Sequence, residues 1–183
     1  MYGPAATGKT NLCLHLAANS KGRIIFIDTE NTFSAQRIRE FNSKADLDKI
    51  CLLKVNSFKK QSEVINELEL LKKIDIIIID SMTKYYRTAL HDDASPTDDL
   101  LKQFHTLRNL YKRLGCKILI TSQVYTTQDG KNMPIGGKPL RDFSKQLIKL
   151  SNENNHVFEV EKHPETPPFK KSFRIEADNI AFF

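Results

Sequence analysis

The residue types and spacing near the N-terminus match a phosphate-binding loop. Residues 3–10 read GPAATGKT and fit the pattern G-x-x-x-x-G-K-S/T at every fixed position. The glycines of this pattern let the backbone wrap a polyphosphate, so that N–H groups and the N-terminus of the next helix point toward the anion. Lys9 would then reach the β- and γ-phosphates, and the Thr10 hydroxyl would bind Mg²⁺. The sequence therefore predicts a site for a nucleoside triphosphate such as ATP, formed by Gly3, Pro4, Ala5, Ala6, Thr7, Gly8, Lys9, Thr10 and Asn11.

Polar side chains follow three apolar runs that have the composition of buried strands. The runs and their polar residues are 23–27 with Asp28 and Glu30, 74–79 with Asp80, and 117–121 with Gln123. In an open parallel sheet, the carboxyl ends of the strands meet at the edge where ligands bind. A strand-end carboxylate beside a phosphate-binding loop suits Mg²⁺. Asp80 is therefore a candidate metal ligand, directly or through water.

These runs alternate with segments that have helical spacing of apolar residues. Helices are expected from residue 9 onward and over 34–41, 59–73 and 97–114, with a further strand over 51–55. The alternation predicts an α/β fold, with a mostly parallel sheet flanked by helices on both faces. Four short runs at 147–150, 157–160, 172–175 and 180–183 predict a C-terminal antiparallel extension.

Two polar segments interrupt this pattern. Residues 83–96 mix charged and aromatic residues, and residues 124–137 contain three glycines and a proline with little apolar content. Both are expected to be loops, and the second is expected to be mobile without a ligand.

Length and composition bound the remaining possibilities. The 183 residues predict one domain, spanning 1–183, and the net charge of +6 suits either a nucleic-acid partner or an ordinary solvated surface. No apolar run approaches the length of a membrane span and no secretory signal is recognisable, so a cytoplasmic location is expected. Met1 and Tyr2 leave no room for the strand that normally precedes a phosphate-binding loop. We expect either a sheet without its first strand or a natural product that extends upstream.

Four further motifs share one order along the chain. They are IDTENTF at 27–33 with Arg37, IDS at 79–81 followed by YRT at 86–88, TSQV at 121–124, and PIGG at 134–137. With the phosphate-binding loop, this order resembles the RecA/RadA recombinase superfamily, and within it the short archaeal RadB-like paralogues. The resemblance covers nearly the whole chain and implies a RecA-like P-loop NTPase core.

The resemblance also implies roles for individual residues. Glu30 would polarise the attacking water, Asp80 would help hold Mg²⁺, Arg37 would pack on the adenine, and Gln123 would sense the γ-phosphate. The two polar segments would correspond to the DNA-contacting loops. Candidate DNA contacts are Arg87 in the first segment, Lys131 in the second, and Lys138 and Arg141 just after it. Taken singly, each residue has a plainer reading: a solvated acid, a surface amide, or basic side chains that pair with carboxylates or face the solvent.

Departures from the strand-exchange recombinases shape the expected function. The second polar segment is shorter than theirs, and residues 161–164 read EKHP where they carry an Asp-x-Pro cap. We expect an ATP- and DNA-binding recombination accessory protein with weak or conditional, Mg²⁺-dependent ATP hydrolysis. Its expected partners are single-stranded or branched DNA, a recombinase or junction-processing enzyme, and further copies of the chain. The alternatives are a RecA-fold motor or signalling ATPase, and a nucleotide-gated interaction module that does not bind DNA.

Lys162 and His163 form a separate candidate site after the predicted strand 157–160. In RecA-fold assemblies the corresponding segment lies at the subunit interface, where a cation can reach the neighbour's γ-phosphate. The plainer alternative is a pair of exposed cations at the end of a strand.

Overall fold

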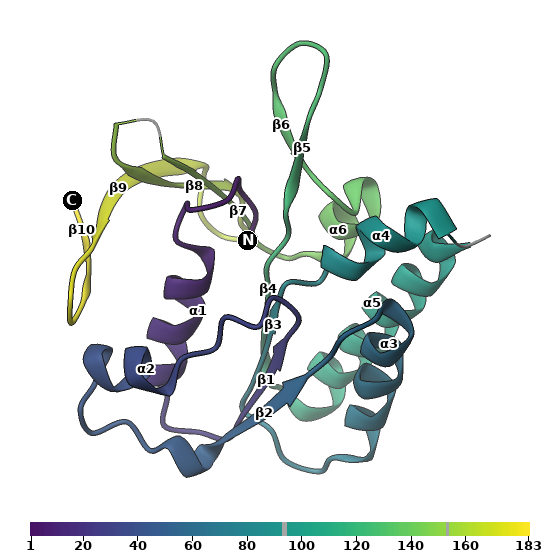
Figure 1. Ribbon diagram of the computed structural model, residues 1–183, viewed down its shortest axis with the longest axis horizontal. Helices are drawn as coiled ribbons and strands as arrows, with labels where there is room; N and C mark the ends of the chain where they lie inside the picture. Colours follow the sequence, from purple (N-terminus) through teal and green to yellow (C-terminus); the bar gives the residue numbers. More distant parts are fainter. Residues whose placement is uncertain (93–94, 153) are drawn as a thin grey trace.

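A four-stranded parallel sheet forms the centre of the molecule (Figure 1). The computed structural model describes residues 1–92, 95–152 and 154–183. The strands are β1 (Ile24–Asp28), β2 (Ile50–Lys54), β3 (Ile76–Asp80) and β4 (Lys117–Ile120), in the order β2-β1-β3-β4. Both β1 and β3 are buried along their whole length and end in an aspartate. The predicted α/β architecture is confirmed.

Helices cover both faces of this sheet because successive side chains of a strand point in opposite directions. Ile76 and Ile78 pack toward α1 (Lys9–Ala18) and α2 (Ala35–Phe41). Ile77 and Ile79 pack in the opposite core, which α3 (Phe58–Glu67), α4 (Lys84–Asp92) and α5 (Pro96–Leu114) help to build. Two short 3₁₀ turns, η1 (Leu47–Lys49) and η2 (Leu68–Leu70), complete the connections. Residues 68–70 lie within the predicted helix 59–73, so α3 ends earlier than expected.

An antiparallel sheet forms the C-terminal part of the chain, as predicted. Its order is β10-β9-β8-β7, from β7 (Leu147–Asn152), β8 (His156–Lys162), β9 (Phe169–Ile175) and β10 (Ile180–Phe182). Of the described helices, none combines the length and apolar character that a membrane-spanning helix requires.

The backbone of Met1 and Tyr2 lies between the two sheets. Tyr2 forms parallel bridges with Ser122 on one side and Lys149 on the other. The Tyr2 N–H donates to the Ile148 carbonyl at 2.8 Å, and the Ser122 N–H donates to the Met1 carbonyl at 3.0 Å. Residues 1 and 2 therefore bridge the two sheets without forming a strand, and an upstream extension of the natural product stays a prediction.

The two expected loops contain regular structure. Within 83–96, residues 93 and 94 lie outside the described residues, and most of the others form α4 because buried Tyr86 anchors one helical face in the core. Within 124–137, β5 (Val124–Thr126) and β6 (Asn132–Pro134) pair as a hairpin that projects from the body of the molecule (Figure 1). Gly130 turns this hairpin with a φ of 79°, and α6 (Gly137–Phe143) follows it. The prediction of irregular loops was wrong at both places.

Candidate nucleotide-binding site

The phosphate-binding loop joins the Tyr2 backbone to the start of α1. Gly8 occupies the N-cap position of α1 with a φ of 92°, and Ala6 also has a positive φ of 60°. No described side chain caps the first N–H groups of α1, and its first turn contains no acidic residue. These N–H groups and the positive end of the helix dipole are therefore available to an anion.

The Lys9 side chain folds back over the loop. Its ammonium donates to the carbonyls of Gly3 at 2.7 Å and Pro4 at 2.6 Å, and the Thr7 hydroxyl also donates to Pro4. Burial lowers the pKa of Lys9, while the carboxylates of Asp80 and Glu30 oppose that shift. A phosphate at the loop would offer this ammonium a charged partner in place of two neutral carbonyls.

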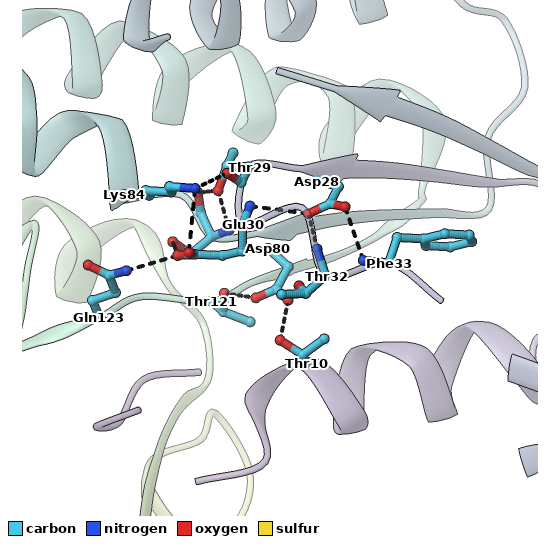
Figure 2. A network of polar contacts seen from close by, with 11 residues as sticks. Thr10, Asp28, Thr29, Glu30, Thr32, Phe33, Asp80, Lys84, Thr121 and Gln123 are labelled. Carbon is cyan, nitrogen blue, oxygen red and sulfur yellow. Dashed lines mark hydrogen bonds and ion pairs between the residues drawn. The ribbon is translucent and has the colours of Figure 1, made fainter. Parts of the chain in front are cut away.

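Asp80 meets the loop from the end of β3 (Figure 2). The Thr10 hydroxyl donates to Asp80 Oδ2 at 2.6 Å, and the Thr121 hydroxyl donates to Oδ1. Burial raises the pKa of the Asp80 carboxyl, and the two hydrogen bonds act in the opposite direction. A buried carboxylate beside a hydroxyl is a set of hard oxygen donors, which fits Mg²⁺.

Glu30 lies on the segment that follows β1, and three side chains contact its carboxylate (Figure 2). Ser81 Oγ and Gln123 Nε2 both donate to Oε1 at 2.9 Å, and Lys84 Nζ lies 3.7 Å from Oε2. Gln123 Oε1 is buried and has no hydrogen-bond partner among the described residues. The structure thus brings together Glu30, Gln123 and Asp80, three of the four strand-end residues that the sequence singled out.

Asp28 holds this segment in place, a role that the sequence analysis missed. Its Oδ1 accepts from the N–H groups of Glu30 at 3.1 Å and Thr32 at 3.3 Å, and its Oδ2 accepts from Phe33 N–H at 3.0 Å. An aspartate that caps nearby backbone N–H groups is a recurring local motif, and its position just before a polar segment was the available signal. The capped turn fixes the direction in which the Glu30 side chain leaves the backbone.

Arg37 connects three parts of the chain. Its guanidinium donates to Asn11 Oδ1 at 3.1 Å and to the carbonyls of Glu176 and Ala177 in the turn between β9 and β10. It also lies 4.1 Å from the centre of the Phe41 ring. Arg37 therefore stands beside the start of α1, and its contact with adenine stays a prediction.

The candidate DNA-contacting residues lie on three elements. Arg87 is exposed on α4, Lys131 is exposed in the β5–β6 turn and pairs with Asp129 at 2.7 Å, and Lys138 is exposed on α6. Arg141, also on α6, is half-buried, and its guanidinium lies 3.9 Å from Glu161. The described contacts do not join these four side chains to one another.

Lys162 and His163 lie at the end of β8. The Lys162 ammonium donates to the Arg141 carbonyl at 2.9 Å, and His163 Nε2 lies 2.9 Å from Gln146 Nε2. These contacts place both side chains beside α6 and the start of β7, and no described contact joins them to the phosphate-binding loop of the same chain. An approach to the nucleotide of a neighbouring subunit stays a prediction.

Comparison with known proteins decides the family. A sequence model of the Rad51 family matches residues 1–182. The chain belongs to the Rad51 family. The DNA repair and recombination protein RadB of Methanococcus maripaludis strain C7 is 34% identical over 175 residues, covering 89% of this chain and 80% of the relative.

Further Rad51-family relatives have the same description. RadB of Methanococcoides burtonii is 33% identical over 195 aligned residues, covering 98% of this chain and 86% of the relative. RadB of Methanocaldococcus jannaschii is 33% identical over 187 residues, with coverage of 96% and 88%. The resemblance to RadB-like members of the RecA/RadA superfamily is confirmed, so the polar network lies in a fold shared with DNA repair and recombination proteins.

Proposed function

We propose that this protein binds ATP, Mg²⁺ and DNA and acts as an accessory factor in DNA recombination and repair, with weak or conditional ATP hydrolysis. The contact between Thr10 and Asp80 carries the nucleotide part of this proposal. These residues are far apart in sequence, yet the hydroxyl and the carboxylate oxygen are 2.6 Å apart. Paired oxygen donors beside uncapped N–H groups suit a metal–polyphosphate ligand.

The residues have separate tasks in ATP hydrolysis. Loop N–H groups and Lys9 bind the phosphates. Thr10 and Asp80 would hold Mg²⁺, which when bound would supply positive charge to neutralise the transferred phosphoryl group. Glu30 orients the attacking water, and Gln123, which donates to Glu30 Oε1, senses the γ-phosphate.

The contacts of Glu30 support slow or conditional turnover. Its Oε1 accepts from two side chains, and its Oε2 faces Lys84. Water must share these oxygens with the partners that already occupy them, or one partner must move away. A rearrangement of Gln123, which lies at the base of the β5–β6 hairpin, would free Glu30 for water.

Two substitutions separate ATP binding from hydrolysis. Lys9→Ala should abolish ATP binding, because it removes the cation that faces the β- and γ-phosphates. Glu30→Gln should leave ATP affinity within about twofold and lower turnover by about 100-fold or more, because an amide is a poor base for water. Nucleotide titration and phosphate release measure the two effects. Unchanged turnover in Glu30→Gln would exclude this residue from catalysis.

Exposed cations on neighbouring elements support the DNA part of the proposal. Lys131 and Lys138 lie on the hairpin and on α6, which directly follows it. Changing both to alanine should weaken binding of a single-stranded oligonucleotide and flatten the dependence of log affinity on log salt by about one to two phosphate equivalents.

A titration of fluorescent oligonucleotide at several salt concentrations measures both quantities. The double variant Lys44→Ala, Lys112→Ala is the matched control, because it removes two exposed cations from other surfaces. If both double variants behave alike, general charge explains the binding. No binding by the unaltered protein would favour the interaction module that does not contact DNA.

A further inference from the structure

Lys84 is the first residue of α4, and its side chain reaches the segment that carries Glu30 (Figure 2). The ammonium donates to the Thr29 carbonyl at 2.6 Å and lies 3.7 Å from Glu30 Oε2. The side chain of Lys84 is 31% exposed and that of Glu30 is 25% exposed, so solvent screens this pair only partly. One cation thus contacts both the backbone before Glu30 and its carboxylate.

The three partners of Glu30 act on different atoms. Ser81 and Gln123 are neutral donors and both bind Oε1. Lys84 is the only charged side chain that contacts Glu30 among the described residues, and it faces Oε2. The carboxylate is therefore held from two sides, and removal of Lys84 would leave Oε2 without its described partner.

Through its hydrogen bond to the Thr29 carbonyl, Lys84 also restrains the backbone of the segment that carries Glu30. The Thr29 N–H donates to the Asp80 carbonyl at 2.8 Å, while the Thr29 carbonyl accepts from Lys84. A hydrogen bond from a charged donor is stronger than one between neutral groups. Asp28 ties the N–H groups after Thr29 to β1, so Lys84 supplies the matching restraint from α4.

We propose that Lys84 is a positioning residue that holds Glu30 in place for ATP hydrolysis and connects it to α4. This inference rests on the proposed role of Glu30. Arg87 lies one turn further along α4, so a ligand that displaces this helix would also move the ammonium that holds Glu30. In this role Lys84 acts through its contacts with Glu30 and the Thr29 carbonyl.

Lys84→Met tests the proposal because methionine keeps the length of the side chain and removes its charge and donors. Lys84 and Tyr85 border a hollow of about 440 Å³, so methionine fits without overpacking. The kcat for ATP should fall about tenfold while KM stays within about twofold, since misplacing a catalytic group affects the reaction step and leaves ATP affinity intact. Lys84→Arg should recover most of the loss, and Lys112→Met on α5 should behave like the unaltered protein. Unchanged kcat, or a change confined to KM, would overturn the proposal.

Hydrogen exchange provides a readout that does not depend on turnover. The N–H groups of Glu30, Thr32 and Phe33 are hydrogen bonded in the segment that Lys84 restrains. Their exchange should be at least about threefold faster in Lys84→Met and unchanged in Lys84→Arg, while amides of the β1 core keep their rates.

The two readouts separate the two proposals. If Glu30→Gln lowers turnover but Lys84→Met changes neither kcat nor exchange, the inference is wrong and the proposed function stands. If the unaltered protein binds no ATP, the proposed function fails, and unchanged exchange in Lys84→Met would independently overturn the positioning role.

Discussion

Asp80 combines two opposing demands on one side chain. The carboxylate is only 1% exposed, which raises its pKa, and it accepts hydrogen bonds from Thr10 and Thr121. The charged form is costly to bury without a cation but is the form that binds one. Burial of the Asp80 carboxylate therefore lowers the stability of the metal-free protein and leaves a side chain that can bind a metal cation.

The raised pKa of Asp80 predicts that the stability of the metal-free protein depends on pH. Because the folded chain holds the Asp80 proton at pH values where the unfolded chain has released it, the contribution of Asp80 to the free energy of unfolding falls as pH rises above about 3.8. Asp80→Asn lacks this titration, so its stability relative to the unaltered protein should increase with pH through that window. Urea unfolding in EDTA from pH 4 upward measures the difference.

Magnesium and ATP should shift the difference in the free energy of unfolding in favour of the unaltered protein. At ligand concentrations of about 100 times Kd, binding stabilises the unaltered protein by about 2.7 kcal/mol. Asp80→Asn should gain much less. A stability difference that does not vary with pH would contradict the assignment of the raised pKa to Asp80.

The junction between the phosphate-binding loop and α1 depends on a backbone without a side chain. At Gly8 the φ of 92° favours glycine, and an added Cβ would lie 2.9 Å from Ile175 Cδ1 on β9. The C-cap of α5, Gly115, has a φ of 64° but open space around the position of a Cβ. Substitutions at these two glycines therefore distinguish the cost of backbone strain from the cost of a steric contact.

Alanine at each position tests the difference. Gly115→Ala should lower the free energy of unfolding by about 1 kcal/mol through backbone strain alone. Gly8→Ala should cost about 2–3 kcal/mol, because Ile175 must also shift, and it should weaken ATP binding. Denaturant midpoints and a nucleotide titration measure these effects. Equal losses of stability at the two positions would mean that Ile175 on β9 moves aside without a measurable cost in free energy.

Some parts of the site could be predicted from the sequence and others could not, for a physical reason. Parallel strands place their carboxyl ends at one edge, so Asp80 and Glu30 were expected to lie close to Lys9 and Thr10. The Thr10 hydroxyl contacts Asp80, and Gln123 joins the same network through its bond to Glu30. The α4 helix was missed because its composition is polar and only its packing surface is apolar. The contact between Lys84 and Glu30 depends on that helix, so spacing along the chain did not reveal it.

At the scale of the molecule, Lys162 and Arg141 join the C-terminal sheet to α6. The Lys162 ammonium uses one donor on the Arg141 carbonyl, while the Arg141 side chain approaches Glu161 on β8. This surface carries a candidate DNA contact and a candidate contact with a neighbour's nucleotide. Association of subunits there would link the two.

Lys162→Ala should lower ATP turnover several-fold while leaving ATP affinity of the isolated subunit unchanged, because the cation acts on a neighbour's phosphate. Turnover per subunit of the unaltered protein should rise with protein concentration. Mixing Lys162→Ala with Lys9→Ala protein should restore part of the activity, since one subunit supplies the intact pocket and the other the cation. Turnover that is independent of concentration, without rescue on mixing, would exclude this role.

The short backbone segment at Met1 and Tyr2 has a consequence for how the molecule comes apart. The same two residues pair with Ser122 on one side and with β7 on the other. Separating either sheet from this segment would therefore leave backbone groups without hydrogen bonds. The phosphate-binding loop, which begins at Gly3, follows this segment directly. We therefore expect the two sheets to unfold together, and a phosphate bound by the loop to stabilise both of them.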